Sequence, residues 1–353
     1  MKSILLFISI CLFLAFSGNE KSYFQKPKSW PEPHYNFQKN PLSNAKIDLG
    51  RALFYDPILS RNETISCASC HLSYTAFTHV DHSLSHGIDD KIGKRNSPAL
   101  MNLAWGKFFM WDGAINHLDM QALAPITNHL EMDEKIENVV QKLNKSVIYP
   151  NLFDKSFGDS TITGERILKA ISQFLLTIVS SDSKYDSVMR KEVTFTQNEK
   201  AGYELFKKNC NNCHTEPLFT NNKLENNSLP LDTVLKDFGR MNITHNRKDS
   251  LKFKVPSLRN IEFSFPYMHD GRFKKLKQVL NHYTSGILIE PGTSPSDLTK
   301  DEHKETNSKH RKKPILLTAD EKADLIAFLF TLTDKSFLYN PKYGFPSHIL
   351  SRK

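Results

Sequence analysis

Two short stretches of this sequence carry residues whose types and spacing can do redox chemistry. They are Cys67–His71 and Cys210–His214, and both read Cys-x-x-Cys-His. Two thiols one helical turn apart can each add to a vinyl group of one porphyrin, and the adjacent histidine can then ligate the iron. A zinc site would need its thiols in other combinations, and four of the five cysteines lie in these two motifs. The spacing therefore predicts two covalently bound haem c groups, attached through Cys67, Cys70, Cys210 and Cys213 with His71 and His214 as iron ligands.

Length and charge limit the fold and the partners. The chain has 353 residues, enough for two domains that each bury a core. Its net charge is +9, which favours an acidic electron-transfer partner or an anionic surface. The sequence resembles no nucleic-acid-binding motif, so we expect no nucleic-acid partner.

The first residues have the pattern of a secretory signal. Lys2 precedes an apolar run over residues 4–14, and Ala15-Phe16-Ser17 offers a cleavage site between small residues. The run is too short to favour a membrane span. We therefore expect a signal peptide over residues 1–18 and a periplasmic protein, since haem c is attached outside the bacterial cytoplasm. Cys11 could instead anchor a lipoprotein, but its lead-in sequence fits that alternative less well.

Helical periodicity dominates the ordered part of the chain. Apolar residues recur at helical spacing over residues 162–179. Ser43, Thr196 and Thr318 each precede a segment that starts like a helix, and the last two open Thr-x-x-Glu capping boxes. No segment has convincing strand periodicity. The predicted fold class is therefore mostly α.

Three segments are expected to lead or connect rather than to form core helices. Residues 19–41 are polar and contain prolines at positions 27, 31, 33 and 41, which indicates an extended N-terminal segment. Residues 180–194 are expected to connect the two halves of the chain. Residues 294–313 are charged and poor in apolar side chains, which indicates a loop.

The two haem motifs belong to a longer internal repeat. Gly-x-x-Leu-Phe occurs upstream of each motif, at residues 50–54 and 202–206. Downstream, residues 98–113 and 256–271 align without a gap and share Pro-x-Leu-x-Asn and Met-x-Asp-Gly. Such self-similarity predicts two related haem domains in tandem. A duplicated scaffold without haem is the weaker alternative, because the repeat is tied to both motifs.

The same register distinguishes the second haem site from the first. Tyr283 in the second half lies opposite Pro125 in the first. A tyrosine can ligate haem iron through its phenolate, whereas a proline has no side-chain donor. The alternative is a tyrosine on a helix packing face. The competing ligands for this haem are Met268, His269 and His282.

A polar pair occurs only in the first half. Gln121 and Glu131 lie opposite Val279 and Ile289 of the second half. An open ferric haem beside a carboxylate suits peroxide chemistry, because the carboxylate can take a proton from the bound oxygen and return it to the leaving oxygen. Alone, each residue could equally be a solvated helix residue. Their absence from the second copy favours the functional interpretation.

Beyond the haem motifs, several segments are individually specific: Leu49–Phe54, Arg95–Pro98, Trp111–Gly113, Glu131–Met132, Phe253–Asn260 and Pro266–Gly271. Together they resemble the bacterial dihaem cytochrome c peroxidase family, which includes the MauG-type enzymes. The resemblance covers about residues 42–335. It implies two cytochrome c-like domains, a peroxidatic haem in an N-terminal domain over residues 42–190 and an electron-transfer haem in a C-terminal domain over residues 191–353.

The resemblance also implies roles for individual residues. Trp111 matches the tryptophan between the two haems. Gln121 and Glu131 match the active-site pair beside the peroxidatic haem. A calcium ion between the domains is implied by matching oxygen ligands, which suit that ion. These ligands are the side chain of Asn96 and the carbonyls of Ser264 and Pro266.

Two positions that distinguish subtypes of the family disagree. His86 matches the loop histidine that closes the peroxidatic haem in peroxidases needing reductive activation, although a loop histidine can also simply face solvent. Tyr283 lies where typical peroxidases carry methionine and MauG-type enzymes carry tyrosine. Methionine raises the haem potential, and a phenolate should lower it. Ala114 also replaces the arginine that commonly follows Trp-Asp-Gly in the family.

We therefore predict a dihaem c-type peroxidase that reduces hydrogen peroxide to water with electrons from a small cytochrome c or a cupredoxin. The first alternative is a MauG-like oxidase that modifies a partner protein or substrate, which rests on Tyr283. The second is a dihaem electron carrier without catalysis. A homodimer is compatible with the sequence.

Overall fold

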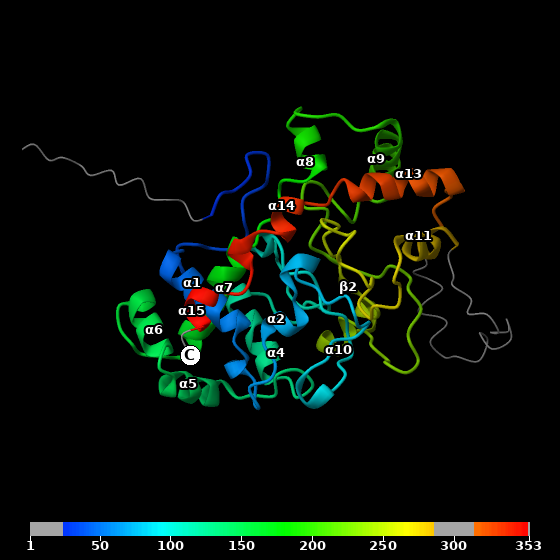
Figure 1. Cartoon of the computed structure of the whole chain (residues 1–353). Coiled ribbons are helices and arrows are strands. Elements are labelled where there is room, and N and C mark those ends of the chain that lie inside the picture. The colour runs from blue at the N-terminus through cyan, green and yellow to red at the C-terminus, as the bar shows by residue number, and fades with distance from the viewer. Residues whose placement is uncertain (1–23, 286–313, 352–353) are drawn as a thin grey trace, which may run out of the picture.

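The computed structural model describes residues 24–285 and 314–351. In this part of the chain the helices pack around two hydrophobic cores (Figure 1). None of the helices described there is long and apolar enough to cross a membrane. The predicted signal peptide with Cys11 and the charged segment 294–313 lie outside the described residues.

The first core is organised by the helices α1 (Asn44–Tyr55) and α7 (Gly164–Thr177), which pack against each other. Ser43 caps α1, as predicted, because its hydroxyl accepts a hydrogen bond from the backbone N–H of Lys46. A Cβ at Gly50 would come within 1.8 Å of the Ala170 carbonyl oxygen. Only glycine therefore permits this close approach of the two helices.

The second core repeats this arrangement with the helices α9 (Gln197–Asn209) and α13 (Ala319–Phe330), which lie side by side in Figure 1. Both predicted capping boxes are present, at Thr196 and at Thr318. A Cβ at Gly202 would come within 1.9 Å of the Asp324 carbonyl oxygen. The sequence repeat therefore extends to the helix packing.

The loops between these helices also repeat. Asn102 and Asn260 both adopt a left-handed conformation, with φ of 58° and 56°. Met110 and Met268 do so as well, with φ of 66° and 74°. These matching turns confirm the gapless register predicted for residues 98–113 and 256–271. Isolated bridges close the equivalent turns, at Phe109 with Ile115 and at Tyr267 with Phe273.

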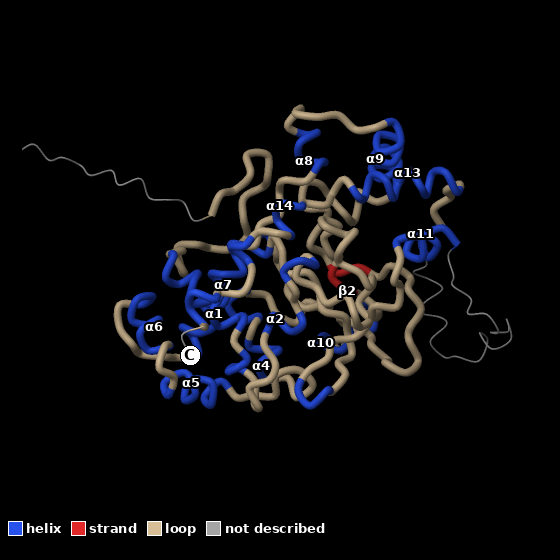
Figure 2. The backbone as a smooth tube through the Cα atoms, in the orientation of Figure 1, coloured by secondary structure: helices blue, strands red, loops and turns tan. Residues whose placement is uncertain are grey.

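Helices account for most of the regular structure, which confirms the mostly α fold class (Figure 2). Within residues 24–285 and 314–351, the other α-helices are α2 (Cys67–Cys70), α3 (Leu118–Gln121), α4 (Leu123–Thr127), α5 (Ile136–Lys145), α6 (Tyr149–Phe157), α8 (Lys184–Met189), α10 (Met241–Thr244), α11 (Leu276–Ser285), α14 (Lys335–Leu338) and α15 (Ser347–Leu350). The 3₁₀ turns are Pro57–Leu59, Ser73–Thr75, Ile88–Asp90, Leu103–Trp105, Arg247–Asp249 and Pro341–Tyr343. The strands β1 (Leu224–Glu225) and β2 (Phe253–Lys254) form one antiparallel pair.

Two connecting segments carry more structure than their composition indicates. The N-terminal segment lies over the first core, where the Trp30 ring packs 4.8 Å from that of Trp105. Residues 180–194 link the two cores, and they contain α8, whose Tyr185 is buried in the second core.

The C-terminal residues return to the first core, although the sequence grouped them with the second half. Leu338 and Leu350 are buried in the first core. The hydroxyl of Tyr55 donates to the Tyr343 carbonyl over 2.6 Å, and Arg51 Nε donates to the Gly344 carbonyl over 2.7 Å. Side chains of α1 thus hold the tail through its backbone. The division of the chain at residue 190 stays a prediction.

Candidate dihaem site

The first haem motif forms the single helical turn α2. Ser66 and Ser69 close this turn in a capping box, which places the two thiols one turn apart, as porphyrin attachment requires. Burial raises the pKa of Cys67 to about 12 and that of Cys70 to about 11. The surroundings of both thiols therefore disfavour the charged thiolate.

His71 is oriented by the loop that follows it. Its Nδ1–H donates to the Phe77 carbonyl over 2.7 Å, which leaves Nε2 as the nitrogen with a free lone pair. Burial lowers the pKa of His71 to about 4, so the imidazole is neutral near pH 7. A neutral imidazole held through its other nitrogen is the usual form of a metal-ligating histidine. The motif therefore fits haem c.

The second haem motif follows directly on α9. Burial raises the pKa of Cys210 to about 12. Nδ1 of His214 lies 3.2 Å from two backbone carbonyl oxygens, those of Phe219 and Pro256. The imidazole is thus held by backbone acceptors as in the first site, and this motif also fits haem c.

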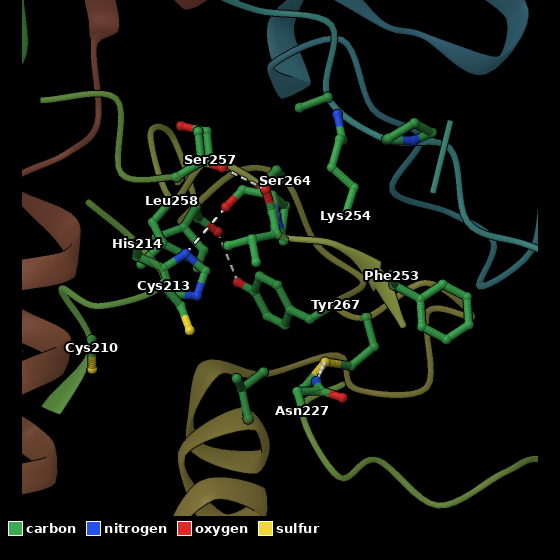
Figure 3. Close-up of a pocket in the computed structure, with 18 of the residues that line it drawn as sticks. Cys210, Cys213, His214, Asn227, Phe253, Lys254, Ser257, Leu258, Ser264 and Tyr267 are labelled. Atoms are coloured by element: carbon green, nitrogen blue, oxygen red, sulfur yellow. Dashed lines mark hydrogen bonds between the residues drawn. The ribbon is translucent and has the colours of Figure 1, made fainter. Parts of the chain in front are cut away.

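A cavity of about 430 Å³ opens beside His214. Figure 3 shows Cys210, Cys213 and His214 on one side of it and Phe253 and Lys254 on the other. A volume of this size is typical of cofactor sites. Tyr283 lines the same cavity, and so do the three competing ligands Met268, His269 and His282. The ligand role of Tyr283 stays a prediction.

Asn227 connects the candidate ligands of this cavity. Its side-chain amide lies 3.5 Å from the Tyr283 hydroxyl and 3.5 Å from the sulfur of Met268. Nε2–H of His282 donates to the Asn227 carbonyl over 3.0 Å, and Nδ1 of His282 has no partner among the described residues. Burial raises the pKa of Tyr283, and the Asn227 amide opposes this effect. His269 instead stacks on Phe253, with ring centroids 3.7 Å apart.

Glu131 lies close to the first haem motif. Its charge contributes to the raised pKa of Cys70, after burial. Burial also raises the pKa of Glu131 itself, while the Asn128 side chain opposes this by donating to Oε1 over 2.7 Å. Gln121 ends α3, and its amide lies 3.8 Å from the sulfur of Met110. Gln121 and Glu131 share no hydrogen bond in the described part of the chain, so the structure does not join the predicted pair directly.

The segment that contains His86 packs against both Glu131 and the first haem motif. The His86 carbonyl oxygen lies 3.3 Å from Cys70 Sγ. The N–H of Ile88 donates to the Glu131 carbonyl over 2.7 Å. The His86 ring stacks on that of His82 with centroids 4.0 Å apart. His86 therefore belongs to the surroundings of the first site, and its ligation of the haem stays a prediction.

Trp111 links the two halves. Its indole N–H donates to the Asn96 carbonyl over 2.8 Å, and its own carbonyl accepts from the N–H of Lys254 over 2.7 Å. Trp111 also lines the cavity beside His214. The three residues expected to bind calcium, Asn96, Ser264 and Pro266, line this cavity too. The side-chain amide of Asn96 donates to the Ser83 carbonyl over 3.1 Å.

The turn after Trp111 is held without the arginine that Ala114 replaces. Arg95 Nη1 donates to the Asp112 carboxylate over 2.6 Å. Arg240 Nη1 donates to the Gly113 carbonyl over 2.7 Å. In the second copy Arg272 follows the equivalent glycine and bonds to Asp270. Arg95 and Arg240 therefore hold the turn at Gly113 by hydrogen bonds, as Arg272 holds the equivalent turn at Gly271.

Sequence reasoning missed several of these supporting residues. Asn128 could have been considered, because an asparagine three residues from a candidate base can reach it. No local sequence pattern indicates the roles of Asn227 and Arg240, because both contact residues that are distant in the sequence. Lys254 belongs to the segment Phe253–Asn260, which carries the family resemblance but no separate signal for a lysine at the cavity.

Two tandem haem c sites on a repeated helical scaffold define a dihaem c-type protein. The family model for di-haem cytochrome c peroxidase matches residues 44–194. The methylamine utilization protein MauG of Methylorubrum extorquens is 33% identical over 88% of this chain and 84% of its own length. Cytochrome c551 peroxidase of Nitrosomonas europaea is 36% identical over 68% of this chain and 73% of its length. The crystal structure of a MauG-like protein associated with microbial copper homeostasis is 32% identical and covers 91% of this chain and 98% of its own, with a TM-score of 0.80.

The chain therefore belongs to the dihaem cytochrome c peroxidase and MauG family. Membership confirms the predicted resemblance and the tandem cytochrome c-like fold. It also implies two haem c groups and an oxidoreductase of the dihaem peroxidase or oxidase type.

Proposed function

We propose that this protein is a periplasmic peroxidase that reduces hydrogen peroxide to water at the haem held by His71. One observation carries the proposal. A carboxylate, Glu131, lies half-buried beside the first haem motif, and its counterpart in the second half is Ile289. The two haems would supply the redox chemistry when bound, and the chain supplies geometry and proton transfer.

The proposed roles follow from the positions of the side chains. With haem held by His71, Glu131 would accept a proton from one oxygen of the peroxide and deliver it to the departing oxygen. Asn128 holds Oε1 of Glu131 in place for this transfer. The amide of Gln121 orients the peroxide. Trp111 lies in the wall of the second cavity and provides the link between the two sites.

The proposal also includes the electron donor, the remaining haem ligands and a calcium ion. The net charge of +9 suits a small acidic cytochrome c or cupredoxin as electron donor. Tyr283 would be the second protein ligand of the haem held by His214, and His86 would be that of the haem held by His71 at rest. Calcium binds at Asn96 with the carbonyls of Ser264 and Pro266.

The variant Glu131→Gln tests the proposal. We expect peroxide turnover to fall about 10²- to 10⁴-fold, the range for loss of a general acid–base group, while both haems stay attached. Glu137→Gln is the matched control, because it makes the same chemical change at an exposed position on α5. Turnover in Glu131→Gln equal to that of the control would show that the proton-transfer assignment is wrong.

A MauG-like oxidase is the second candidate, because Tyr283 lines the cavity of the second haem and MauG proteins are among the relatives. Steady turnover with a reduced cytochrome c would favour the peroxidase. Peroxide-dependent modification of a partner protein, with slow cytochrome oxidation, would favour the oxidase. The plain electron carrier predicts that peroxide leaves the spectrum of both haems unchanged.

A further inference from the structure

Lys254 lies at the wall of the second cavity without a balancing anion. Its side chain lines the cavity on the side opposite Cys213 and His214 (Figure 3). Its ammonium group forms no ion pair within 4.0 Å with any carboxylate of residues 24–285 or 314–351, whereas Lys252 two positions earlier pairs with Asp249. Burial alone lowers the pKa of Lys254 to about 8. The Lys254 side chain is half-buried, and an ammonium group withdrawn from water in this way is costly unless an anion accompanies it.

The nearest carboxylate in the strand pair is not placed to be that anion. Glu225 also lines the cavity, but the register sets it opposite Phe253, while Lys254 faces Leu224. Neighbouring residues of a strand point to opposite faces. Lys254 and Glu225 therefore occupy different faces of the strand pair.

The position of Lys254 is fixed through its backbone. Its N–H donates to the Trp111 carbonyl over 2.7 Å, and β2 pairs with β1. The next residues, Val255 and Pro256, lead to the carbonyl that lies 3.2 Å from Nδ1 of His214. Residues 254–256 therefore contact both His214 and Trp111 through their backbone, and they carry the Lys254 ammonium group.

We propose that Lys254 binds a propionate carboxylate of the haem attached at Cys210 and Cys213. Haem carries two carboxylates on an otherwise apolar ring, so it brings the missing anion into this cavity itself. The ion pair anchors the edge of this haem next to Trp111 and offsets the negative charge of the propionate. The inference rests on the part of the proposed function that places this haem on His214.

The sign of the effect on the haem potential follows from the charges. An uncompensated propionate stabilises ferric iron over ferrous iron and lowers the potential. Lys254→Met removes the cation while it keeps an unbranched side chain. We expect the reduction equilibrium of this haem to shift at least about tenfold toward the ferric form, which is about 59 mV for one electron. Lys254→Arg keeps the charge and should keep the potential close to that of the parent protein.

The experiment uses the purified dihaem protein and measures both haem potentials by spectroelectrochemistry. Lys252→Met is the matched control, since it removes the same charge two residues away from a lysine that pairs with Asp249. Covalent haem content and the thermal transition establish that each variant is folded and loaded. A crystal structure of the holoprotein should place Lys254 Nζ within 4 Å of a propionate oxygen.

Two results would overturn the inference. One is a potential in Lys254→Met that shifts no more than in Lys252→Met. The other is a holoprotein structure in which Lys254 pairs with Glu225 or with no propionate. Neither result depends on peroxide turnover. The potential shift in Lys254→Met therefore tests the propionate contact separately from the proposed peroxidase activity.

Discussion

The pH dependence of peroxide turnover should be set by Glu131 and should move when Asn128 is replaced. Burial raises the pKa of Glu131, and the hydrogen bond from Asn128 opposes this over 2.7 Å. A hydrogen bond to a charged group contributes about 1.5–3 kcal/mol, and one pKa unit corresponds to about 1.4 kcal/mol. Asn128→Ala removes this opposing hydrogen bond and should therefore raise the pKa of Glu131 further.

The direction of the change follows from the role of the carboxylate. The charged form accepts the proton, so kcat/KM falls as the pH falls through the pKa of Glu131. A higher pKa moves this acid limb to higher pH, and the plateau above it should change less. The assay is kcat/KM for peroxide as a function of pH, which reports the pKa values of the free enzyme.

The chain offers a matched control for this variant. Asn138 donates to Glu134 over 2.8 Å, so Asn138→Ala removes the same kind of bond from a glutamate that pairs with Lys142. Its acid limb should coincide with that of the parent protein. An acid limb that stays in place in Asn128→Ala would refute the assignment of Glu131 as the proton acceptor.

Two further predictions concern the second haem and the helix packing. Tyr283→Phe should raise the potential of the low-spin haem and change its ferric spectrum, because a phenolate favours ferric iron; an unchanged spectrum would remove Tyr283 as a ligand. Gly50→Ala should destabilise the protein by about 3 kcal/mol, because the new Cβ would lie 1.8 Å from the Ala170 carbonyl oxygen. Denaturant unfolding of Gly50→Ala measures this loss. Gly344→Ala is the control, with its nearest contact at 3.7 Å, and equal stability of the two variants would contradict the packing argument.

The helices and the repeat could be predicted because their signals are local. Ser43, Thr196 and Thr318 cap helices through residues three positions away. The equal spacing of residues 98–113 and 256–271 reappears as matching left-handed turns at Asn102 and Asn260. Both haem motifs follow from the fixed spacing of their cysteines, which chemistry rather than packing dictates.

Features that depend on contacts distant in the sequence could not be predicted. Arg240 reaches the turn at Gly113 from 127 positions away. The C-terminal tail joins the first core because Arg51 and Tyr55 bind its carbonyls, and no periodicity reveals such a contact. The contact of Gln121 with Met110 likewise depends on how the end of α3 folds against the preceding turn.

The central claim is that peroxide reacts at the haem held by His71 while Tyr283 closes the other haem. Absorption and EPR spectra of the ferric and the half-reduced protein, each with and without peroxide, test it most directly. The account predicts that one haem responds to peroxide in at least one of these states, and that this response survives in Tyr283→Phe. Two low-spin haems that ignore peroxide in both states, or a response lost together with the tyrosine, would contradict it.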